Sequence, residues 1–235
     1  RDHVAHTLQT GLLTTALPAI DGFDLAVSSR PVEAVGGDFY DAFAVGDGAW
    51  GLLLGDVCGK GAEAAALTGQ ARYGVRTITG REQRPAAVLR ELNDTLLRHG
   101  TRERFCTGIF ARVDERECRV TVACAGHPAP LLVRAGSRPE PVPVSGTLLG
   151  VTERPLLRDE DLALRPGDAL VLYTDGIPEA RTAGGGMVGT EGVIETLASL
   201  PAGSAQELAD GLVRLAQTDP EGQRDDAAAL VLRAR

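Results

Sequence analysis

The order of strand-like and helix-like segments is the feature that most constrains the fold of this chain. Residues 38–57 are typical of two strands joined at Asp47-Gly48, a dipeptide that favours a tight hairpin turn. Two helical stretches, 60–79 and 85–98, then follow one another with no strand between them. Because strands and helices do not alternate regularly, the sequence predicts an α+β fold in which antiparallel sheets pack against helices.

In the rest of the chain, the predicted strands and helices likewise do not alternate regularly. Leucines at helical spacing predict a helix before Pro18. Ser204, followed three residues later by Glu207, forms the capping-box pattern that starts a helix. The remaining predicted elements are strands at 105–114, 118–126, 129–136, 169–176 and 225–235 and helices at 191–200 and 204–217, with Pro/Gly-rich linkers up to about 150.

Length and composition argue against several classes of protein. The 235 residues carry a net charge of −8 and no cluster of lysine or arginine, which disfavours a nucleic-acid binder. The four cysteines form no C-x-x-C pair, so neither a disulfide framework nor a zinc site is expected. No apolar run approaches the roughly 20 residues that span a bilayer, and no signal-peptide pattern is present. We therefore expect one cytoplasmic globular domain over residues 1–235.

The glycine-rich stretch GDVCGKGAEAAALTG at 55–69 does not fit a nucleotide-binding loop. A Walker A loop has four residues between its glycines and a hydroxyl residue after its lysine, whereas here only three residues intervene and another glycine follows Lys60. The stretch instead places Asp56 at the end of an apolar strand. A carboxylate in that position needs a partner or a metal ion, although a turn or helix-capping aspartate is the commoner explanation for one such residue.

A second aspartate, Asp38, begins the preceding strand. A hairpin that turns about residues 47–48 places Asp38 opposite Val57, one residue from Asp56. A strict two-residue turn then puts the two carboxylates on opposite faces of the sheet, whereas a bulge or a three-residue turn puts them on the same face. The sequence predicts that the two aspartates lie close together, but it does not determine whether their side chains lie on the same face of the sheet.

Two more apolar strands carry aspartates at their ends. Asp175 ends the strand LVLYTDG, and Asp225 and Asp226 begin the strand DDAAALVL. Because the end of one antiparallel strand neighbours the start of the next, we expect these carboxylates to meet those of the hairpin at one sheet edge. Carboxylates at such short distances repel one another, and hard divalent cations such as Mg²⁺ or Mn²⁺ relieve the repulsion. Two such ions about 3.5–4 Å apart are the usual arrangement for phosphoryl chemistry.

Six segments together resemble the SpoIIE-like serine phosphatases of bacteria, a branch of the metal-dependent protein phosphatase 2C superfamily. The segments are VGGDFYDAF, LLLGDVCGKGAEAA, ACAGHPAPLLVR, GTLLGV, LVLYTDGIPEAR and RDDAAALVL; they follow the family's order and span nearly the whole chain. The resemblance implies a four-layer αββα sandwich of two antiparallel sheets flanked by helices. It also implies a serine/threonine phosphoprotein phosphatase that uses two Mn²⁺ or Mg²⁺ ions and a water molecule that they activate.

The resemblance assigns roles to individual residues. The metal ligands that it implies, which would act in catalysis through the activated water, are Asp38, Asp56, Asp175 and Asp225, together with the backbone carbonyl of Val57. Asp226 is the weaker candidate of the adjacent pair, because the family's ligand is usually the first position of this motif.

At two positions the sequence differs from the residue pattern of the wider superfamily. Its eukaryotic-type members carry a histidine two residues after the second aspartate, where this chain has Cys58, so the donor of the leaving-group proton stays open. They also hold the phosphate with an upstream arginine. Arg30 is the nearest candidate for that arginine, although its spacing does not match cleanly.

The same resemblance suggests a substrate and an assembly. The implied substrate is a phosphorylated anti-sigma-factor antagonist protein, and residues 1–18 are expected to form a linker or switch helix through which two copies can form a homodimer. Plain packing of this helix on the domain is an equal alternative. A catalytically weak sensor or docking module and a hydrolase of small phosphate esters are the other functions considered, and the presence of all four aspartates favours an active enzyme.

Overall fold

The computed structural model describes residues 16–32, 36–59, 61–99, 105–200, 203–220 and 222–235. Most of the predicted N-terminal helix, up to residue 15, lies outside these ranges. The chain folds as two compact units. The first unit contains residues 34–127 and 143–163, and the second contains residues 19–33, 128–142 and 164–235.

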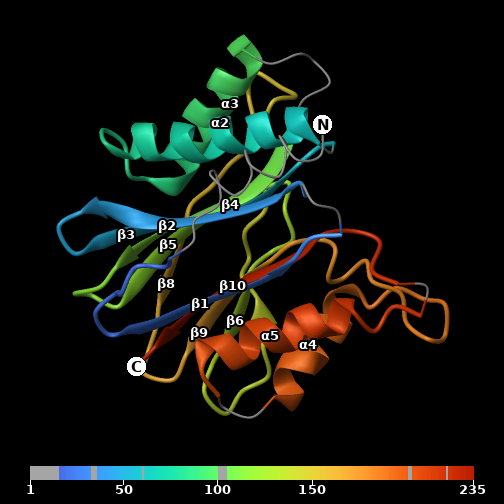
Figure 1. Cartoon of the computed structure of the whole chain (residues 1–235). Helices are drawn as coiled ribbons and strands as arrows, with labels where there is room; N and C mark the ends of the chain where they lie inside the picture. The colour runs from blue at the N-terminus through green and yellow to red at the C-terminus, as the bar shows by residue number, and fades with distance from the viewer. Residues whose placement is uncertain (1–15, 33–35, 60, 100–104, 201–202, 221) are drawn as a thin grey trace. The chain divides into compact units, whose positions relative to one another are not determined.

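The first unit is a five-stranded antiparallel sheet with two helices on one face (Figure 1). Its strands, in their order across the sheet, are β2 (Asp38–Gly46), β3 (Ala49–Val57), β4 (Cys106–Asp114), β5 (Arg119–Ala125) and β8 (Glu160–Ala163). Helix α2 (Ala62–Thr79) packs on β2 and β3, and α3 (Pro85–His99) packs on β4 and β5. Apolar side chains such as Phe39, Phe110 and Leu89 fill the space between sheet and helices.

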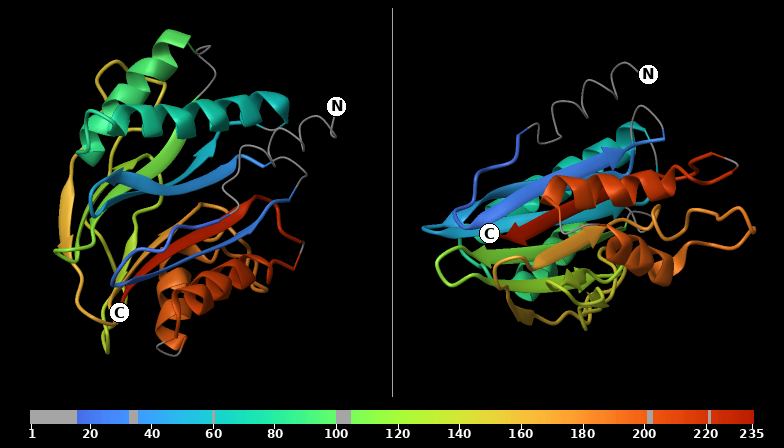
Figure 2. Two further views of the ribbon diagram at one scale, coloured as in Figure 1. Left: turned by 60° about the vertical axis from the view of Figure 1, so that its left-hand side comes forward. Right: turned by 90° about the horizontal axis from the view of Figure 1, so that it is seen from below.

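The second unit is also a five-stranded antiparallel sheet covered by two helices. Its strands, in order, are β1 (Phe23–Arg30), β10 (Ala227–Ala234), β9 (Ala169–Tyr173), β6 (Leu131–Val133) and β7 (Glu140–Pro141). Helix α5 (Ala205–Ala216) lies along β1 and β10, and α4 (Gly189–Ser199) packs against α5 (Figure 2). A core that includes Val171, Val231 and Leu212 lies between this sheet and its helices.

The predicted α+β class is confirmed, because two antiparallel sheets and four helices make up the described part of the chain. The capping box is also confirmed, since the Ser204 side chain accepts from the Glu207 amide and the Glu207 side chain from the Ser204 amide. Strands β1, β7 and β8 were not predicted. Within the described ranges, no helix combines the length and the apolar character needed to cross a membrane. That residues 1–235 form a single phosphatase domain stays a prediction.

Candidate functional site

Asp38 and Asp56 are direct cross-strand partners in the β2–β3 hairpin. The register between the two strands shifts between Ala44 and Gly46, so the hairpin contains a bulge near its turn. Directly opposed residues of an antiparallel pair point to the same face of the sheet. Of the two arrangements left open by the sequence, the one with both carboxylates on a common face is therefore present, and both residues are half-buried.

Gly37, the residue before β2, allows a close approach of backbone and carboxylate. The Val57 amide donates to the Gly37 carbonyl at 3.2 Å. A Cβ atom at Gly37 would stand 2.7 Å from the Val57 carbonyl oxygen and closer still to Oδ1 of Asp56. These two oxygen atoms therefore border the same small space, which only glycine leaves open.

The residues next to this hairpin end include two thiols in contrasting surroundings. Cys58 is exposed, and its amide donates to the Phe105 carbonyl at 3.0 Å. Cys106 is the cross-strand partner of Val57 and is buried. Burial raises the pKa of the Cys106 thiol to about 12, and the charge of Asp56 contributes in the same direction.

A buried charge cluster ties β2 to α2 three residues beyond Asp38. Asp41 is fully buried and accepts hydrogen bonds from Nε and Nη2 of Arg76, both at 2.7 Å, while Arg72 lies 3.4 Å away. The guanidinium of Arg76 also lies 4.6 Å from the centre of the Phe43 ring. The hydrogen bonds that Arg76 donates to Asp41 raise the pKa of Arg76. This cluster was not predicted from the sequence, although two arginines four residues apart on a predicted helix were a signal for it.

In the second unit, Asp175 follows β9 and lies beside the start of β10. Thr174 anchors this segment, because its amide donates to the Ala228 carbonyl at 3.0 Å and its hydroxyl accepts from the Ala228 amide at 2.9 Å. A Cβ atom at Gly176 would overlap the Asp226 carbonyl oxygen, so the two chain segments touch there. Burial raises the pKa of Asp175, and the carboxylates of Glu179 and Asp225 raise it further.

Asp225 and Asp226 have different environments. The Asp226 carboxylate is largely buried and accepts from the Val32 amide at 2.7 Å, which fixes the chain after β1. Asp225 is exposed. The side-chain amide of Gln223 donates to the carbonyl oxygens of Asp225 and Arg30, at 2.8 and 2.7 Å, so the backbone of Arg30 lies close to this segment. Asp225 is thus the member of the pair that is accessible to a ligand.

The four predicted aspartates therefore form two pairs. Asp38 and Asp56 belong to the sheet of the first unit, and Asp175 and Asp225 border the sheet of the second. The expectation that all four meet at one edge of a single sheet was wrong, because β10 pairs with β1 and β9 and not with the hairpin strands. Among the residues with described positions, no group of three His, Cys, Asp or Glu side chains is arranged so that it could hold a metal ion.

A pocket of about 230 Å³ adjoins Asp225. Arg181 and Arg224 contribute positive charge to its lining, and Glu179 and Asp219 contribute negative charge. Asp219 is held in place by the Arg181 amide, which donates to it at 3.1 Å. Neither arginine was singled out from the sequence, although Arg181 belongs to the GIPEAR segment and Arg224 directly precedes Asp225.

Comparison with known proteins gives these residues a context. The family described as Stage II sporulation protein E (SpoIIE) matches residues 46–235. The phosphoserine phosphatase RsbU of Bacillus subtilis is 27% identical over 183 residues, which are 77% of this chain and 54% of that protein. Protein IcfG of Synechocystis is 25% identical, and the match covers 81% of this chain and 34% of that protein. The chain thus spans between about a third and about half of the length of these relatives.

Solved structures share the fold over almost the whole chain. The structure of the RsbU and RsbW domains of Rv1364c from Mycobacterium tuberculosis is 29% identical, with a TM-score of 0.79 over 95% of this chain and 63% of that one. The SiaA-PP2C domain of Pseudomonas aeruginosa is 22% identical, with a TM-score of 0.81 over 100% of this chain and 95% of that one. The family match covers most of the chain and includes Asp56, Asp175 and Asp225. The chain belongs to the SpoIIE family, as its sequence motifs predicted.

Proposed function

We propose that this chain is a metal-dependent serine/threonine phosphoprotein phosphatase. The observation that carries the proposal is the cross-strand pair of Asp38 and Asp56 next to the Val57 carbonyl, in a chain of the SpoIIE family. Both units are proposed to belong to one phosphatase domain, since the family match runs through each of them.

The donor atoms fit a hard divalent cation. The proposed ligands of two Mn²⁺ or Mg²⁺ ions are Asp38, Asp56, Asp175, Asp225 and the Val57 carbonyl. All of these are oxygen donors, which suit Mg²⁺ and Mn²⁺ rather than zinc or copper. Gly37 allows the backbone to approach two of these oxygens closely, so both lie at the same place beside the start of β2.

Two structural neighbours support the choice of metal. The catalytic domain of the serine threonine protein phosphatase PstP, 19% identical, was solved in complex with 2 manganese ions. RsbX, 12% identical, was solved in complex with magnesium.

The residues around the two aspartate pairs determine what the protein contributes to the reaction in addition to the metal ions. When bound, the metal ions neutralise phosphate oxygens and activate a water molecule for attack on phosphorus. Asp38 and Asp56 hold their oxygens on one face of the hairpin, where the bulge fixes their register. Arg181 and Arg224 line the pocket at Asp225 together with Glu179 and Asp219, so this pocket presents charges of both signs beside the second pair. The buried Asp41–Arg76 pair keeps β2 and α2 in place behind the first pair.

The proposed substrate is a phosphorylated anti-sigma-factor antagonist. RsbU is described as a phosphoserine phosphatase, and the Rv1364c structure combines an RsbU domain with an RsbW domain. The substrate is proposed from these relatives, and a role of residues 1–18 as a switch or dimer helix stays a prediction.

The test is an assay with Mn²⁺ on three substrates: a phosphoserine antagonist protein, a nucleotide and a sugar phosphate. We expect release of phosphate from the phosphoprotein, dependent on Mn²⁺ and abolished in Asp175→Asn. Preferential hydrolysis of the small esters would favour an esterase instead. Binding of the phosphoprotein without turnover in any metal would favour the docking module and contradict the proposal.

A further inference from the structure

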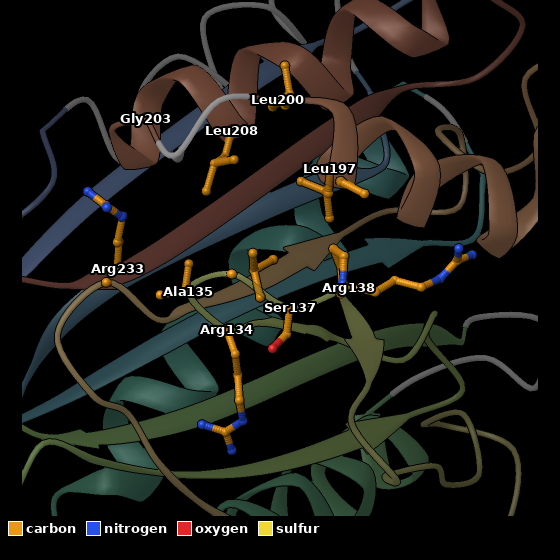
Figure 3. Close-up of a pocket in the computed structure, with 15 residues that line it drawn as sticks. Arg134, Ala135, Ser137, Arg138, Leu197, Leu200, Gly203, Leu208 and Arg233 are labelled. Atoms are coloured by element: carbon orange, nitrogen blue, oxygen red, sulfur yellow. The ribbon is translucent and has the colours of Figure 1, made fainter.

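A second, larger pocket in the second unit lies away from Asp175 and Asp225. Its volume is about 600 Å³, and its lining comes from the loop after β6, the start of β9, the end of β10 and the helices α4 and α5 (Figure 3). Arg233 and Ala169 are cross-strand partners at this end of the sheet. Asp225 precedes the opposite end of β10, so the six residue steps from Ala227 to Arg233 separate the pocket from it by roughly 20 Å at about 3.3 Å per residue. Within the second unit, the pocket is therefore distinct from the segment that carries Asp225.

One wall of this pocket is apolar and comes from the helices. Leu197 near the end of α4 and Leu208 in α5 both line the pocket, and Figure 3 shows them on the helix side. Leu200, which follows α4, and Val133, at the end of β6, are partly buried against the same core. A volume within the range of about 300–1,000 Å³ and a largely apolar wall are typical of small-molecule sites.

The loop that forms the opposite wall is held by a buried carboxylate. Asp168, whose side chain is 5% exposed, accepts from Nη1 of Arg134 at 2.9 Å and from the amides of Ala135 and Arg165 at 3.3 and 3.0 Å. The pocket wall is thus fixed by hydrogen bonds without a ligand. The same contact neutralises the charge of Arg134.

Three arginines line the pocket, and they differ in their counter-charges. Arg134 pairs with Asp168, and Arg138 pairs with Glu191. In Figure 3, the side chains of Arg134 and Arg138 point away from the leucines. Neither guanidinium is therefore available to a molecule seated on the apolar wall.

Arg233 is different, because its guanidinium makes no ion pair or hydrogen bond with any other residue whose position the structure describes. Its cross-strand partner Asp24 instead accepts from the Ala205 amide at 2.9 Å. Arg233 is half-buried at the rim of the pocket (Figure 3). A partly desolvated cation beside an apolar wall is stabilised by an anion that another molecule supplies.

We propose that this pocket binds a small organic anion, whose carboxylate or phosphate group pairs with Arg233 while its apolar body contacts Leu197 and Leu208. A free inorganic anion lacks the apolar body, and a neutral apolar molecule lacks the charge. Both should therefore bind much more weakly than a molecule that combines the two. The proposal does not depend on the phosphatase assignment.

The test is isothermal titration calorimetry on the whole chain with octanoate and octyl phosphate. Octanol, acetate and inorganic phosphate serve as the neutral and the short controls. We expect saturable one-to-one binding of at least one octyl anion and no saturable binding of the three controls in the same concentration range. The anion that binds more tightly identifies the head group. Asp175→Asn should bind the octyl anion as the unmodified chain does, which separates this pocket from the proposed catalytic site.

Variants connect the binding to the pocket. Arg233→Gln should weaken binding of the octyl anion at least tenfold, Arg233→Lys should restore much of it, and Arg214→Gln, on the exposed side of α5, should leave it unchanged. Ala135→Trp keeps Arg233 but adds a ring to the lining between Arg233 and Leu208 (Figure 3), so it should abolish binding even if Arg233→Gln fails to fold. The proposal is overturned if neither octyl anion binds, or if binding persists unchanged in the Ala135→Trp protein or in folded Arg233→Gln.

Discussion

Asp38 and Asp56 face each other as cross-strand partners, and the bulge between Ala44 and Gly46 creates this pairing. Like charges directly opposite one another destabilise a hairpin. If both carboxylates held a divalent cation, its positive charge would offset this repulsion. We therefore expect Mn²⁺ or Mg²⁺ to stabilise this hairpin.

The first prediction concerns the two hairpin aspartates. Asp38→Asn and Asp56→Asn should each lower Mn²⁺-dependent phosphatase activity by at least roughly 100-fold. Mutating a residue that only hydrogen-bonds to a metal ligand typically costs about 10- to 100-fold, and loss of the ligand itself should cost at least as much. Asp47→Asn is the matched control, since Asp47 lies at the turn of the same hairpin, where it pairs with Arg116 at the surface. Steady-state assays together with far-UV circular dichroism check the result, and equal activity of the three variants would contradict it.

A second prediction tests the space beside Gly37. In Gly37→Ala the added methyl group would collide with the Val57 carbonyl and the Asp56 carboxylate, so we expect Mn²⁺ affinity to fall tenfold or more. Gly184→Ala is the control, because its Cβ would meet only the Thr182 hydroxyl oxygen, at an ordinary 3.8 Å. Titration of Mn²⁺ followed by electron paramagnetic resonance measures both affinities. An unchanged affinity in Gly37→Ala would show that the metal does not depend on this space.

Local signals made part of the fold predictable. Pro85 marks the start of α3, Ser204 and Glu207 mark the start of α5, and the Asp47-Gly48 turn marks the β2–β3 hairpin. Each of these signals acts within a few residues of the element that it defines. Strands β7 and β8, with two and four residues, are too short to show an alternating pattern.

Long-range pairing made the rest unpredictable. Strand β1 pairs with β10 from the far end of the chain, Phe23 with Ala234, and this pairing places the Asp225 segment in a different sheet from the hairpin. No periodicity within either strand encodes the choice of neighbour. The aspartates were thus identifiable as strand-end carboxylates, while their division into two pairs was not.

The buried cluster at Asp41 should be a determinant of stability. Asp41→Ala leaves Arg72, which is 6% exposed, without the carboxylate that it faces, and removes both hydrogen bonds to Arg76. We expect a loss of about 3–5 kcal/mol in the free energy of unfolding, the usual cost of removing one partner from a buried ion pair. Urea denaturation measures it, with Asp47→Ala as a control that should change little because its pair with Arg116 is at the surface.

The buried thiols predict a dependence of stability on alkaline pH. Burial raises the pKa of Cys106 to about 12 and that of Cys124 to about 11, from 9.0 in an exposed thiol. The folded chain therefore keeps protons that the unfolded chain releases above pH 9, so the free energy of unfolding should decrease as pH rises above 9, by up to about 1.4 kcal/mol per pH unit for each thiol. Below pH 9 these thiols should contribute no slope.

Denaturation midpoints between pH 7 and 10.5 check this sign, and Cys106→Ala should show a shallower decrease than the unmodified chain, whatever its absolute stability. Thiol labelling at pH 8 gives an independent readout: Cys58 is exposed and should react first, while Cys106 and Cys124 should react only on unfolding. Fast labelling of Cys106 in the folded protein would contradict the burial on which the prediction depends.

The adjacent aspartates before β10 allow the loss of a proposed metal ligand to be distinguished from the loss of a structural hydrogen bond. Asp226 is 8% exposed and accepts from the Val32 amide, so Asp226→Ala removes a hydrogen bond to a buried carboxylate and should cost about 1.5–3 kcal/mol of stability. Its effect on Mn²⁺ affinity should stay within a few-fold. Asp225 is exposed, and Asp225→Ala should abolish Mn²⁺-dependent activity while the unfolding midpoint of the metal-free protein hardly changes. Urea denaturation without metal and Mn²⁺ titration of both variants give the two measurements, and the reverse pattern would assign the ligand to Asp226.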